Sequence, residues 1–332
     1  MYIAMQNFWH QYRIHALLVM GAFALGFLAA MTTSVQTRDT DDQAIREYDT
    51  RYQFIHPLLI CQVDENEEAG ELTSLDQKVG RLINASQDDG KIISASVYYR
   101  DLNSNRWMGV NELELYEPAS LLKVPIMMTY LKQVGTDPDI LETVYPYELR
   151  EEAKDKLVQK PILVPNKSYT VLDLIRGMII QSDNSAKDIL EEHADQKSLD
   201  QTYHILGLKD PYESESGLYQ LSTKSYALFF RVLYNGTYLG RRMSNTALQI
   251  LSESEFVLGL RAGTPENIAV AHKYGVRGLT ESNGTEGVEL SDCGIVYHPD
   301  SPYLLCVMTH GTDPYVLAGV IKDVAETVYK EI

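Results

Sequence analysis

The sequence predicts an α/β (α+β) protein: an antiparallel five-stranded sheet, flanked by N- and C-terminal helices, with an inserted all-helical lobe. Three observations predict this architecture. Apolar residues recur at helical spacing near both ends of the domain, over 72–86 and 313–332. Short strand-like segments occur at 91–110 and again after residue 263. Between them, from Ser120 to about Glu255, the pattern is helical, which is typical of a second lobe inserted between strands.

The composition is that of a globular protein and argues against binding to nucleic acid. The 332 residues are 45% hydrophobic and 23% charged. The formal net charge is −17, whereas contacts to phosphates need clustered Lys and Arg side chains. We therefore expect no nucleic-acid partner.

The N-terminal residues differ from the rest of the chain. Residues 16–31, ALLVMGAFALGFLAAM, carry no charge, and with residues 32–35 they would form a helix of roughly 30 Å, enough to cross a bilayer. No A-x-A cleavage site follows, which favours an uncleaved anchor over a signal peptide. We expect a single-pass membrane protein with an extracytoplasmic catalytic domain. Its parts would be a cytoplasmic stub and transmembrane anchor (1–35), a polar stalk (36–71) and the domain (72–332, helical lobe about 120–255).

Each element of the domain has its own signals. Leu75 and Val79 belong to the apolar face of the first helix, and Asn and Ser residues join two strands within 91–110. At the other end, Asp313 is placed to cap the closing helix and Pro314 to occupy its first turn.

Three cysteines, Cys61, Cys293 and Cys306, are too few for a disulfide framework. Cys293 and Cys306 flank a predicted hairpin that turns at residues 298–302, which would place them nearly opposite each other. Such neighbours can be bonded, but buried free thiols are the commoner outcome, and we expect free thiols here.

Ser120 and Lys123 are the first residues that indicate chemistry. Residues three apart lie on one face of a helix, and the helix dipole favours negative charge at its N-terminus. A neutral lysine in an apolar pocket can take the proton of a serine hydroxyl. The alternative is a capping serine beside a surface lysine, and an S-x-x-K pair alone is common.

Two further motifs follow this pair. QSDNSA places Ser182 and Asn184 at the end of an apolar helix, and AHKYGV places Lys273 in a strand, where His272 faces the other way. S-x-x-K, S-D-N and K-T-G occur in this order in the penicillin-recognising serine hydrolases. Residues 72–332 therefore resemble this superfamily, and most closely its class A β-lactamases.

The resemblance implies a role for each matching residue, with no metal and no cofactor. Ser120 would be the acylated nucleophile and Lys123 its base or proton relay. Ser182 would pass the proton to the leaving nitrogen, and Lys273 would meet the substrate carboxylate. The substrate-binding residues would be Asn184, Tyr274, Gly275 and Val276, with the backbone N–H groups of Ser120 and Val276 forming an oxyanion hole.

Two departures from the family pattern affect recognition and turnover. Tyr274 replaces the Thr of K-T-G and carries its hydroxyl farther from the backbone. Class A enzymes hydrolyse the acyl-enzyme with a water held by an E-x-x-x-N motif, which is absent here from a shortened segment between S-D-N and K-Y-G. Glu213 and Glu215 lie in that segment. Either residue could serve as the deacylation base, and the alternative is that both are solvated loop acids.

The sequence thus predicts a membrane-anchored serine hydrolase that forms an acyl-enzyme at Ser120 and hydrolyses β-lactam-type amide bonds. A small-molecule β-lactam and a cell-wall peptide ending in D-alanine both present an acyl carbonyl near a carboxylate. A D-alanyl-D-alanine peptidase or transpeptidase-like penicillin-binding protein with slow deacylation is therefore the alternative. A non-catalytic cell-wall binding module is a third possibility, against which the intact set of motifs argues.

Overall fold

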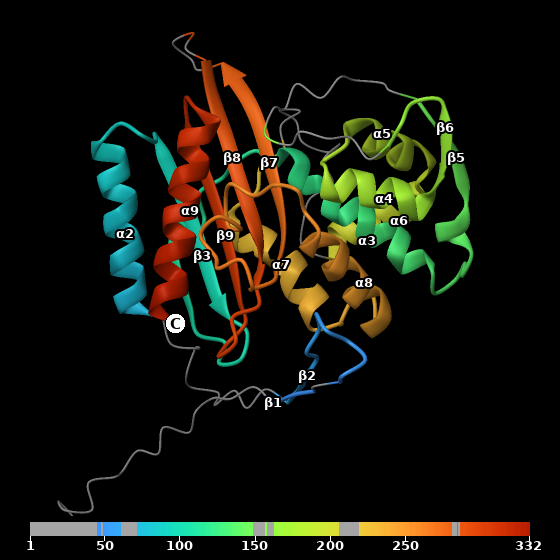
Figure 1. Ribbon diagram of the computed structural model, residues 1–332, viewed down its shortest axis with the longest axis horizontal. Helices are drawn as coiled ribbons and strands as arrows, with labels where there is room; N and C mark the ends of the chain where they lie inside the picture. Colours follow the sequence, from blue (N-terminus) through green and yellow to red (C-terminus); the bar gives the residue numbers. More distant parts are fainter. Residues whose placement is uncertain are drawn as a thin grey trace, which may run out of the picture. The chain divides into compact units, whose positions relative to one another are not determined.

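A five-stranded antiparallel sheet lies at the centre of the computed structural model, with strand order β4–β3–β9–β8–β7 (Figure 1). The strands are β3 (Ser94–Asp101), β4 (Trp107–Val110), β7 (Val270–Thr280), β8 (Glu286–Val296) and β9 (Tyr303–Gly311). The structure describes residues 45–47, 49–60, 72–148, 157, 163–205, 219–280, 284 and 286–332. The predicted five-stranded sheet is confirmed, and β7, which carries the K-Y-G motif, is an edge strand.

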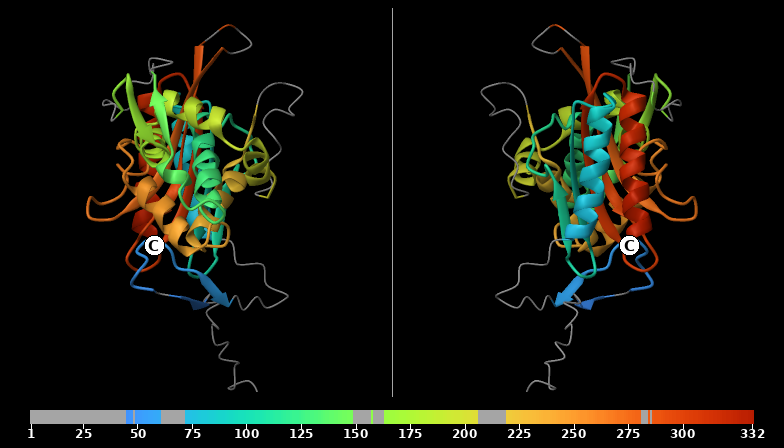
Figure 2. Two further views of the ribbon diagram at one scale, coloured as in Figure 1. Left: turned by 90° about the vertical axis from the view of Figure 1, so that its right-hand side faces the viewer. Right: turned by 90° about the vertical axis from the view of Figure 1, so that its left-hand side faces the viewer.

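Helices α2 (Thr73–Asp88) and α9 (Pro314–Glu331) cover one face of this sheet (Figures 1 and 2). Leu75, Val79 and Ile83 recur every four residues along α2 and are buried, because this spacing keeps them on one helix face. Asp313 caps α9 by accepting the N–H of Tyr315 at 2.8 Å. The predicted flanking helices and the predicted cap are confirmed.

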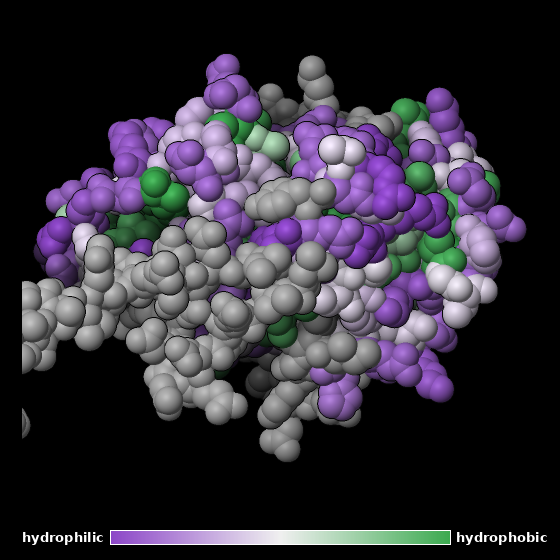
Figure 3. All heavy atoms as spheres, turned by 90° about the horizontal axis from the view of Figure 1, so that it is seen from below, coloured by the Kyte–Doolittle hydropathy of each residue, from purple (hydrophilic) through white to green (hydrophobic). Residues whose placement is uncertain are grey.

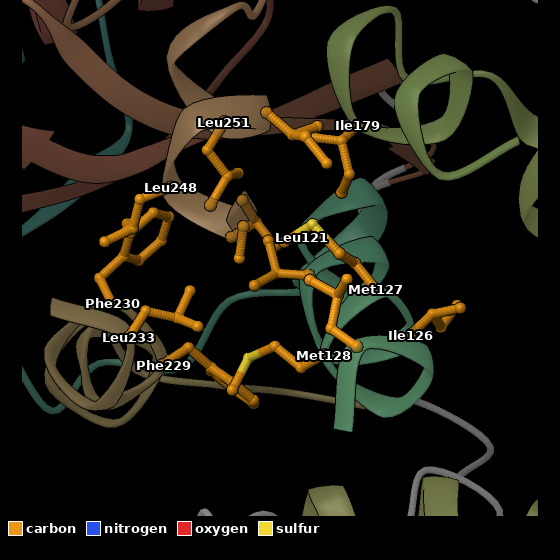
Figure 4. Packing of buried hydrophobic residues seen from close by; sticks show 14 of the residues in the cluster. Leu121, Ile126, Met127, Met128, Ile179, Phe229, Phe230, Leu233, Leu248 and Leu251 are labelled. Atoms are coloured by element: carbon orange, nitrogen blue, oxygen red, sulfur yellow. The ribbon is translucent and has the colours of Figure 1, made fainter. Parts of the chain in front are cut away.

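The opposite face of the sheet carries the helical lobe. Its helices are α3 (Lys123–Gln133), α4 (Val171–Ile180), α5 (Asn184–His193), α6 (Gln196–Ile205), α7 (Thr223–Tyr234) and α8 (Arg241–Ser252), with short 3-10 turns η1 (Ala119–Leu122) and η2 (Ile140–Glu142). Met127, Ile179, Phe230 and Leu248 come from four of these helices and meet in one apolar core (Figure 4). This packing holds in place the helix that follows the S-x-x-K serine.

The lobe is not all-helical, which corrects the sequence prediction. Strands β5 (Val144–Tyr147) and β6 (Lys167–Thr170) pair as a separate two-stranded antiparallel sheet within it. Each strand has four residues, too few to establish a period of two, and Pro146 marks its segment as a turn rather than a strand. Short-range patterns therefore gave no sign of this sheet.

Part of the predicted stalk is packed against the domain. Phe54 and Ile55 are buried in the apolar core of the lobe, and the N–H of Phe54 donates to Asn245 Oδ1 at 2.9 Å. Strands β1 (Ile45–Arg46) and β2 (Leu58–Ile60) flank this stretch. Polar residues surround it in the sequence, so composition alone suggested a solvated linker.

The predicted membrane anchor lies outside the described residues. Among the residues that are described, no helix is both long and apolar enough to span a bilayer. Viewed from below, the coloured surface is mainly hydrophilic, and its apolar residues form small separate patches, in keeping with the acidic composition (Figure 3).

Cys293 and Cys306 form a disulfide, so the expectation of free thiols is wrong. The predicted hairpin brings them together, because they are directly opposed in the register of β8 and β9. Both are completely buried in the sheet beneath the lobe. Cys61 lies outside the described residues.

The disulfide is testable by thiol labelling of the unfolded protein. We expect Cys293 and Cys306 to be alkylated only after reduction, because the bond leaves neither thiol available. Peptide mapping with and without a reductant measures this. Labelling of both residues without reduction would contradict the bond.

Candidate active site

Ser120 lies in the turn η1, immediately before α3. We expected Ser120 to begin the α-helix, but a 3-10 turn comes first and the α-helix starts at Lys123, a frequent transition at helix N-termini. Neither η1 nor α3 has a side-chain cap, so Ser120 is not a capping serine. The next residue, Leu121, points into the core of the lobe (Figure 4), and its carbonyl accepts the Tyr226 hydroxyl at 2.8 Å.

The residue before Ser120 has an unusual backbone. Ala119 has a φ of 45°, in the left-handed region that costs a non-glycine residue about 1–2 kcal/mol. Such a conformation persists only where the surrounding contacts hold it. The orientation of Ser120 is therefore imposed by packing on both sides of the turn.

The side chain of Lys123 is buried, with 3% of the residue's surface exposed. Its Nζ donates to Ser120 Oγ at 2.9 Å and to Asn184 Oδ1 at 2.6 Å. The carbonyl oxygen and Oγ of Ser182 also lie within hydrogen-bond distance of Nζ, at 2.6 Å and 3.1 Å, so its N–H groups are shared among these four oxygens. Lys123 is therefore the hydrogen-bond partner of Ser120 and no surface lysine, and it lies within proton-transfer distance of the hydroxyl.

The S-D-N residues form the turn between α4 and α5. Ser182 has a φ of 59°, and Asp183 caps α5 by accepting the N–H of Ala186 at 2.8 Å. The second oxygen of Asp183 accepts the Tyr147 hydroxyl at 2.7 Å. Burial, together with the Asp183 carboxylate, raises the pKa of Tyr147, so the phenol stays protonated and keeps donating. These contacts fix the turn that presents Ser182 and Asn184 to Lys123.

Lys273 approaches the same serine from strand β7. Its Nζ donates to Ser182 Oγ at 3.0 Å and to the carbonyl of Tyr274 at 2.9 Å. The Ser182 hydroxyl therefore lies between Lys123 and Lys273, and a chain of hydrogen bonds runs from Ser120 through Lys123 and Ser182 to Lys273. The structure brings together the four residues that the sequence predicted to be catalytic.

Tyr274 lies where the sequence prediction did not place it. Its ring is 1% exposed and stacks on Phe256, with ring centroids 4.2 Å apart, in the core on the α9 side of the sheet. The Lys273 ammonium is 4.3 Å from the centroid of the Tyr274 ring, a cation–π contact. We expected a group exposed to substrate, whereas the ring packs in the interior and contacts the side chain of Lys273.

We expect Tyr274→Thr, which creates the family's K-T-G, to destabilise the protein by about 3 kcal/mol because it leaves a cavity beside Phe256. Tyr274→Phe keeps the stacked ring and should cost much less. Denaturant unfolding measures both free energies. A threonine variant as stable as the wild type would show that the ring does not have this packing role.

Gly275 lies beside Ser120. A Cβ atom on Gly275 would be 2.6 Å from the carbonyl oxygen of Pro118 and 3.2 Å from Ser120 N, so only glycine allows β7 to approach this closely. Val276 follows on the same edge strand, and its half-buried side chain packs against the core that contains Tyr274, on the other face of the sheet from Gly275. The use of its N–H in an oxyanion hole stays a prediction.

The remaining sequence predictions have mixed outcomes. Glu213 and Glu215 lie outside the described residues. His272 is excluded from the site as expected, because its Nδ1 is 2.8 Å from Asp292 Oδ1 in the interior.

Sequence reasoning missed the supporting residues Tyr147 and Tyr226, which are distant in the chain and belong to no motif. Within the described ranges, no group of three or more His, Cys, Asp or Glu residues gathers as a metal site would require.

Residues 74–332 match the protein family described as Beta-lactamase enzyme family (Beta-lactamase2), a span well over half of the chain. The chain belongs to the β-lactamase enzyme family. No curated protein matches it. As a member of this family, it is a β-lactamase-like serine hydrolase that acts on amide bonds.

Solved structures share the fold of this β-lactamase-family chain. PBP-A has a TM-score of 0.64 at 23% identity, and the match covers 80% of this chain and 98% of that one. A mutant of PBP-A, solved as an acyl-enzyme complex with penicillin G, has a TM-score of 0.63 at 23% identity, with 80% and 98% covered. A β-lactamase from Chitinophaga pinensis has a TM-score of 0.65 at 22% identity, with 78% and 99% covered. These likenesses show a common fold.

Proposed function

We propose that this hydrolase forms an acyl-enzyme at Ser120 with β-lactams. The observation that carries the proposal is the position of Lys123 Nζ, 2.9 Å from Ser120 Oγ and 3.1 Å from Ser182 Oγ. With Lys123 in its neutral form, Ser120 Oγ attacks the amide carbonyl carbon while its proton passes to the lone pair of Lys123 Nζ. The C–N bond then breaks, and the leaving nitrogen takes that proton through the Ser182 hydroxyl. Water cleaves the resulting ester, releasing the acid and restoring the Ser120 hydroxyl.

The charges around Ser182 support the recognition of an anionic substrate. The Lys273 ammonium contacts the Ser182 hydroxyl, so this side of the site carries positive potential. A carboxylate beside the scissile amide, as in a penicillin, is attracted to it. A mutant of PBP-A has been solved with penicillin G as an acyl-enzyme, which supports the same chemistry for this chain.

A penicillin-binding protein with slow deacylation is the second candidate. The specific observation that favours it is the absence of the E-x-x-x-N motif from the segment before K-Y-G. Without a held water, acylation would be fast and hydrolysis of the ester slow, and a D-alanyl-D-alanine peptide would be the corresponding natural substrate. A non-catalytic cell-wall binding module would need neither step.

The proposed location is the outer face of a membrane, with residues 16–35 as a single anchoring helix. The apolar run of these residues and the Cys293–Cys306 disulfide support it, because disulfides persist mainly outside the reducing cytoplasm. Fractionation of the full-length chain, followed by protease treatment of intact cells, tests the anchor and its orientation.

A time course of intact-protein mass spectra with penicillin G distinguishes these functions. A mass increase that decays while hydrolysed penicillin accumulates supports the β-lactamase. A persistent adduct supports the penicillin-binding protein. Ser120→Ala should give no adduct in either case. A folded wild type that neither gains mass nor hydrolyses penicillin would refute both candidates.

A further inference from the structure

A row of ionisable side chains crosses the sheet one step beyond Gly275. Arg277 on β7, Glu289 on β8 and His310 on β9 are successive cross-strand partners. Residues two apart in a strand share a face, so Arg277 lies on the same face as Gly275. Gly275 packs against the turn formed by residues 118–121, which we call the nucleophile turn. The row therefore adjoins the residues that lead into Ser120.

Two members of this row hold Glu117, three residues before Ser120. Glu289 Oε2 accepts the backbone N–H of Glu117 at 2.8 Å. Arg277 Nε forms an ion pair with the Glu117 carboxylate. The Glu117 side chain is only 13% exposed, whereas Arg277 is 50% exposed, so the ion pair is shielded from water on the Glu117 side only. Glu117 is thus tied to β8 through its backbone and to β7 through its side chain.

These contacts fix the N-terminal end of the strained nucleophile turn. The C-terminal side of the turn is fixed by Leu121, which is buried in the lobe core. Ala119, between Leu121 and Glu117, has the left-handed φ of 45°. If the contacts of Glu117 with the sheet were lost, Ala119 could relax to an ordinary backbone conformation, and Ser120 would rotate away from Lys123.

We propose that Glu289 is a positioning residue for the acylation of Ser120. By accepting the Glu117 N–H, it holds the nucleophile turn against Gly275 and keeps Ser120 Oγ within hydrogen-bond distance of Lys123. It does not touch the substrate. The kinetic part of the proposal rests on the proposed acylation of Ser120, whereas its structural part does not.

The groups that face Glu289 act on it in opposite directions. Burial raises the pKa of Glu289, and so does the charge of Glu117, while the Glu117 N–H, His310 and Arg277 lower it. The phenol of Tyr116 is a further ionisable neighbour of Glu289; burial raises the pKa of Tyr116, so the phenol is uncharged. The net pKa of Glu289 is raised in the folded protein.

The sign of this shift predicts how stability depends on pH. A carboxyl whose pKa is raised by folding contributes stability at low pH, and this contribution is lost as the pH rises through the folded pKa. At neutral pH the Glu289 charge therefore does not stabilise the fold. Glu289→Gln keeps an acceptor oxygen and removes the charge, so it should leave the melting temperature unchanged or raise it.

The test compares Glu289→Ala and Glu289→Gln with Asp101→Ala. Asp101 is a matched control, because it also accepts backbone N–H groups at a partly buried position, those of Asn103 and Ser104 at 2.7 Å, in the β3–β4 hairpin. The measurements are melting temperature, the rate of penicillin acylation from about pH 5 to 8, and amide hydrogen exchange of a peptide spanning residues 115–122.

We expect Glu289→Ala to slow acylation by about tenfold to a hundredfold and to speed exchange in this peptide, because the Glu117 N–H loses its acceptor. Glu289→Gln should restore most of the rate. The wild-type rate should fall as the pH drops through the pKa of Glu289, where the carboxyl becomes a weaker acceptor, and the glutamine variant should lack this fall. Asp101→Ala should lower the melting temperature only.

Unchanged exchange in Glu289→Ala would overturn the proposal, and so would an equal slowing of acylation by Asp101→Ala. A wild type that is not acylated by penicillin would refute the proposed function instead. In that case the amide hydrogen exchange of residues 115–122 tests the structural part of the proposal. Faster exchange in Glu289→Ala but not in Glu289→Gln supports it, and equal exchange in the wild type and both variants overturns it.

Discussion

Lys123→Met should slow the acylation of Ser120 by about 10²–10⁴-fold, the usual contribution of a general base. Methionine has nearly the same length and is apolar, so it fills the buried position of Lys123 without being able to accept a proton. The Ser120 hydroxyl then loses the partner that lies 2.9 Å away. The measurement is the rate of adduct formation with penicillin by intact-protein mass spectrometry.

Lys132→Met is the control for this prediction. Lys132 belongs to the same helix, α3, and its Nζ donates to the carbonyl of Tyr238 at 2.5 Å, away from Ser120. It should lower stability slightly and leave acylation as in the wild type. Acylation of Lys123→Met at the wild-type rate would mean that another group accepts the serine proton.

Gly275→Ala should almost abolish acylation and destabilise the fold by about 1–3 kcal/mol, the range for overpacking. The added Cβ would be 2.6 Å from the carbonyl oxygen of Pro118, and the backbone there is held by the neighbouring turn. Strand β7 would have to move away from Ser120, carrying Lys273 with it. Acylation kinetics and denaturant unfolding measure the two effects.

Gly278→Ala provides the matched comparison on the same strand. A Cβ on Gly278 would have no atom within 4 Å, so the change should affect neither acylation nor stability appreciably. Equal behaviour of the two alanine variants would show that close packing of β7 on the nucleophile turn is unimportant.

The motifs of the candidate active site were predictable because each is local. Ser120 and Lys123 are three residues apart on one turn, and the strand carrying Lys273 has a strong apolar pattern. Asp313 and Pro314 likewise mark the start of α9 by their own chemistry. Such signals depend on neighbouring residues, so they can be read before any tertiary contact is known.

The features that the sequence did not reveal depend on distant contacts. Phe54 packs with residues of the lobe far along the chain, and Tyr274 stacks on Phe256 of a separate loop. One error was avoidable: the alternation of side chains that places His272 opposite Lys273 applies equally to Tyr274. The Glu289 contact with Glu117 joins residues that no spacing rule relates.

The central claim is that Ser120 is the nucleophile, and the most direct measurement is the location of the acyl group. The protein is incubated with penicillin G, quenched, digested and mapped by tandem mass spectrometry. We expect the adduct on Ser120 alone, although the hydroxyl groups of Ser120 and Ser182 are both within hydrogen-bond distance of Lys123 Nζ. An adduct on Ser182, or the absence of both an adduct and penicillin hydrolysis from a correctly folded protein, would contradict this account.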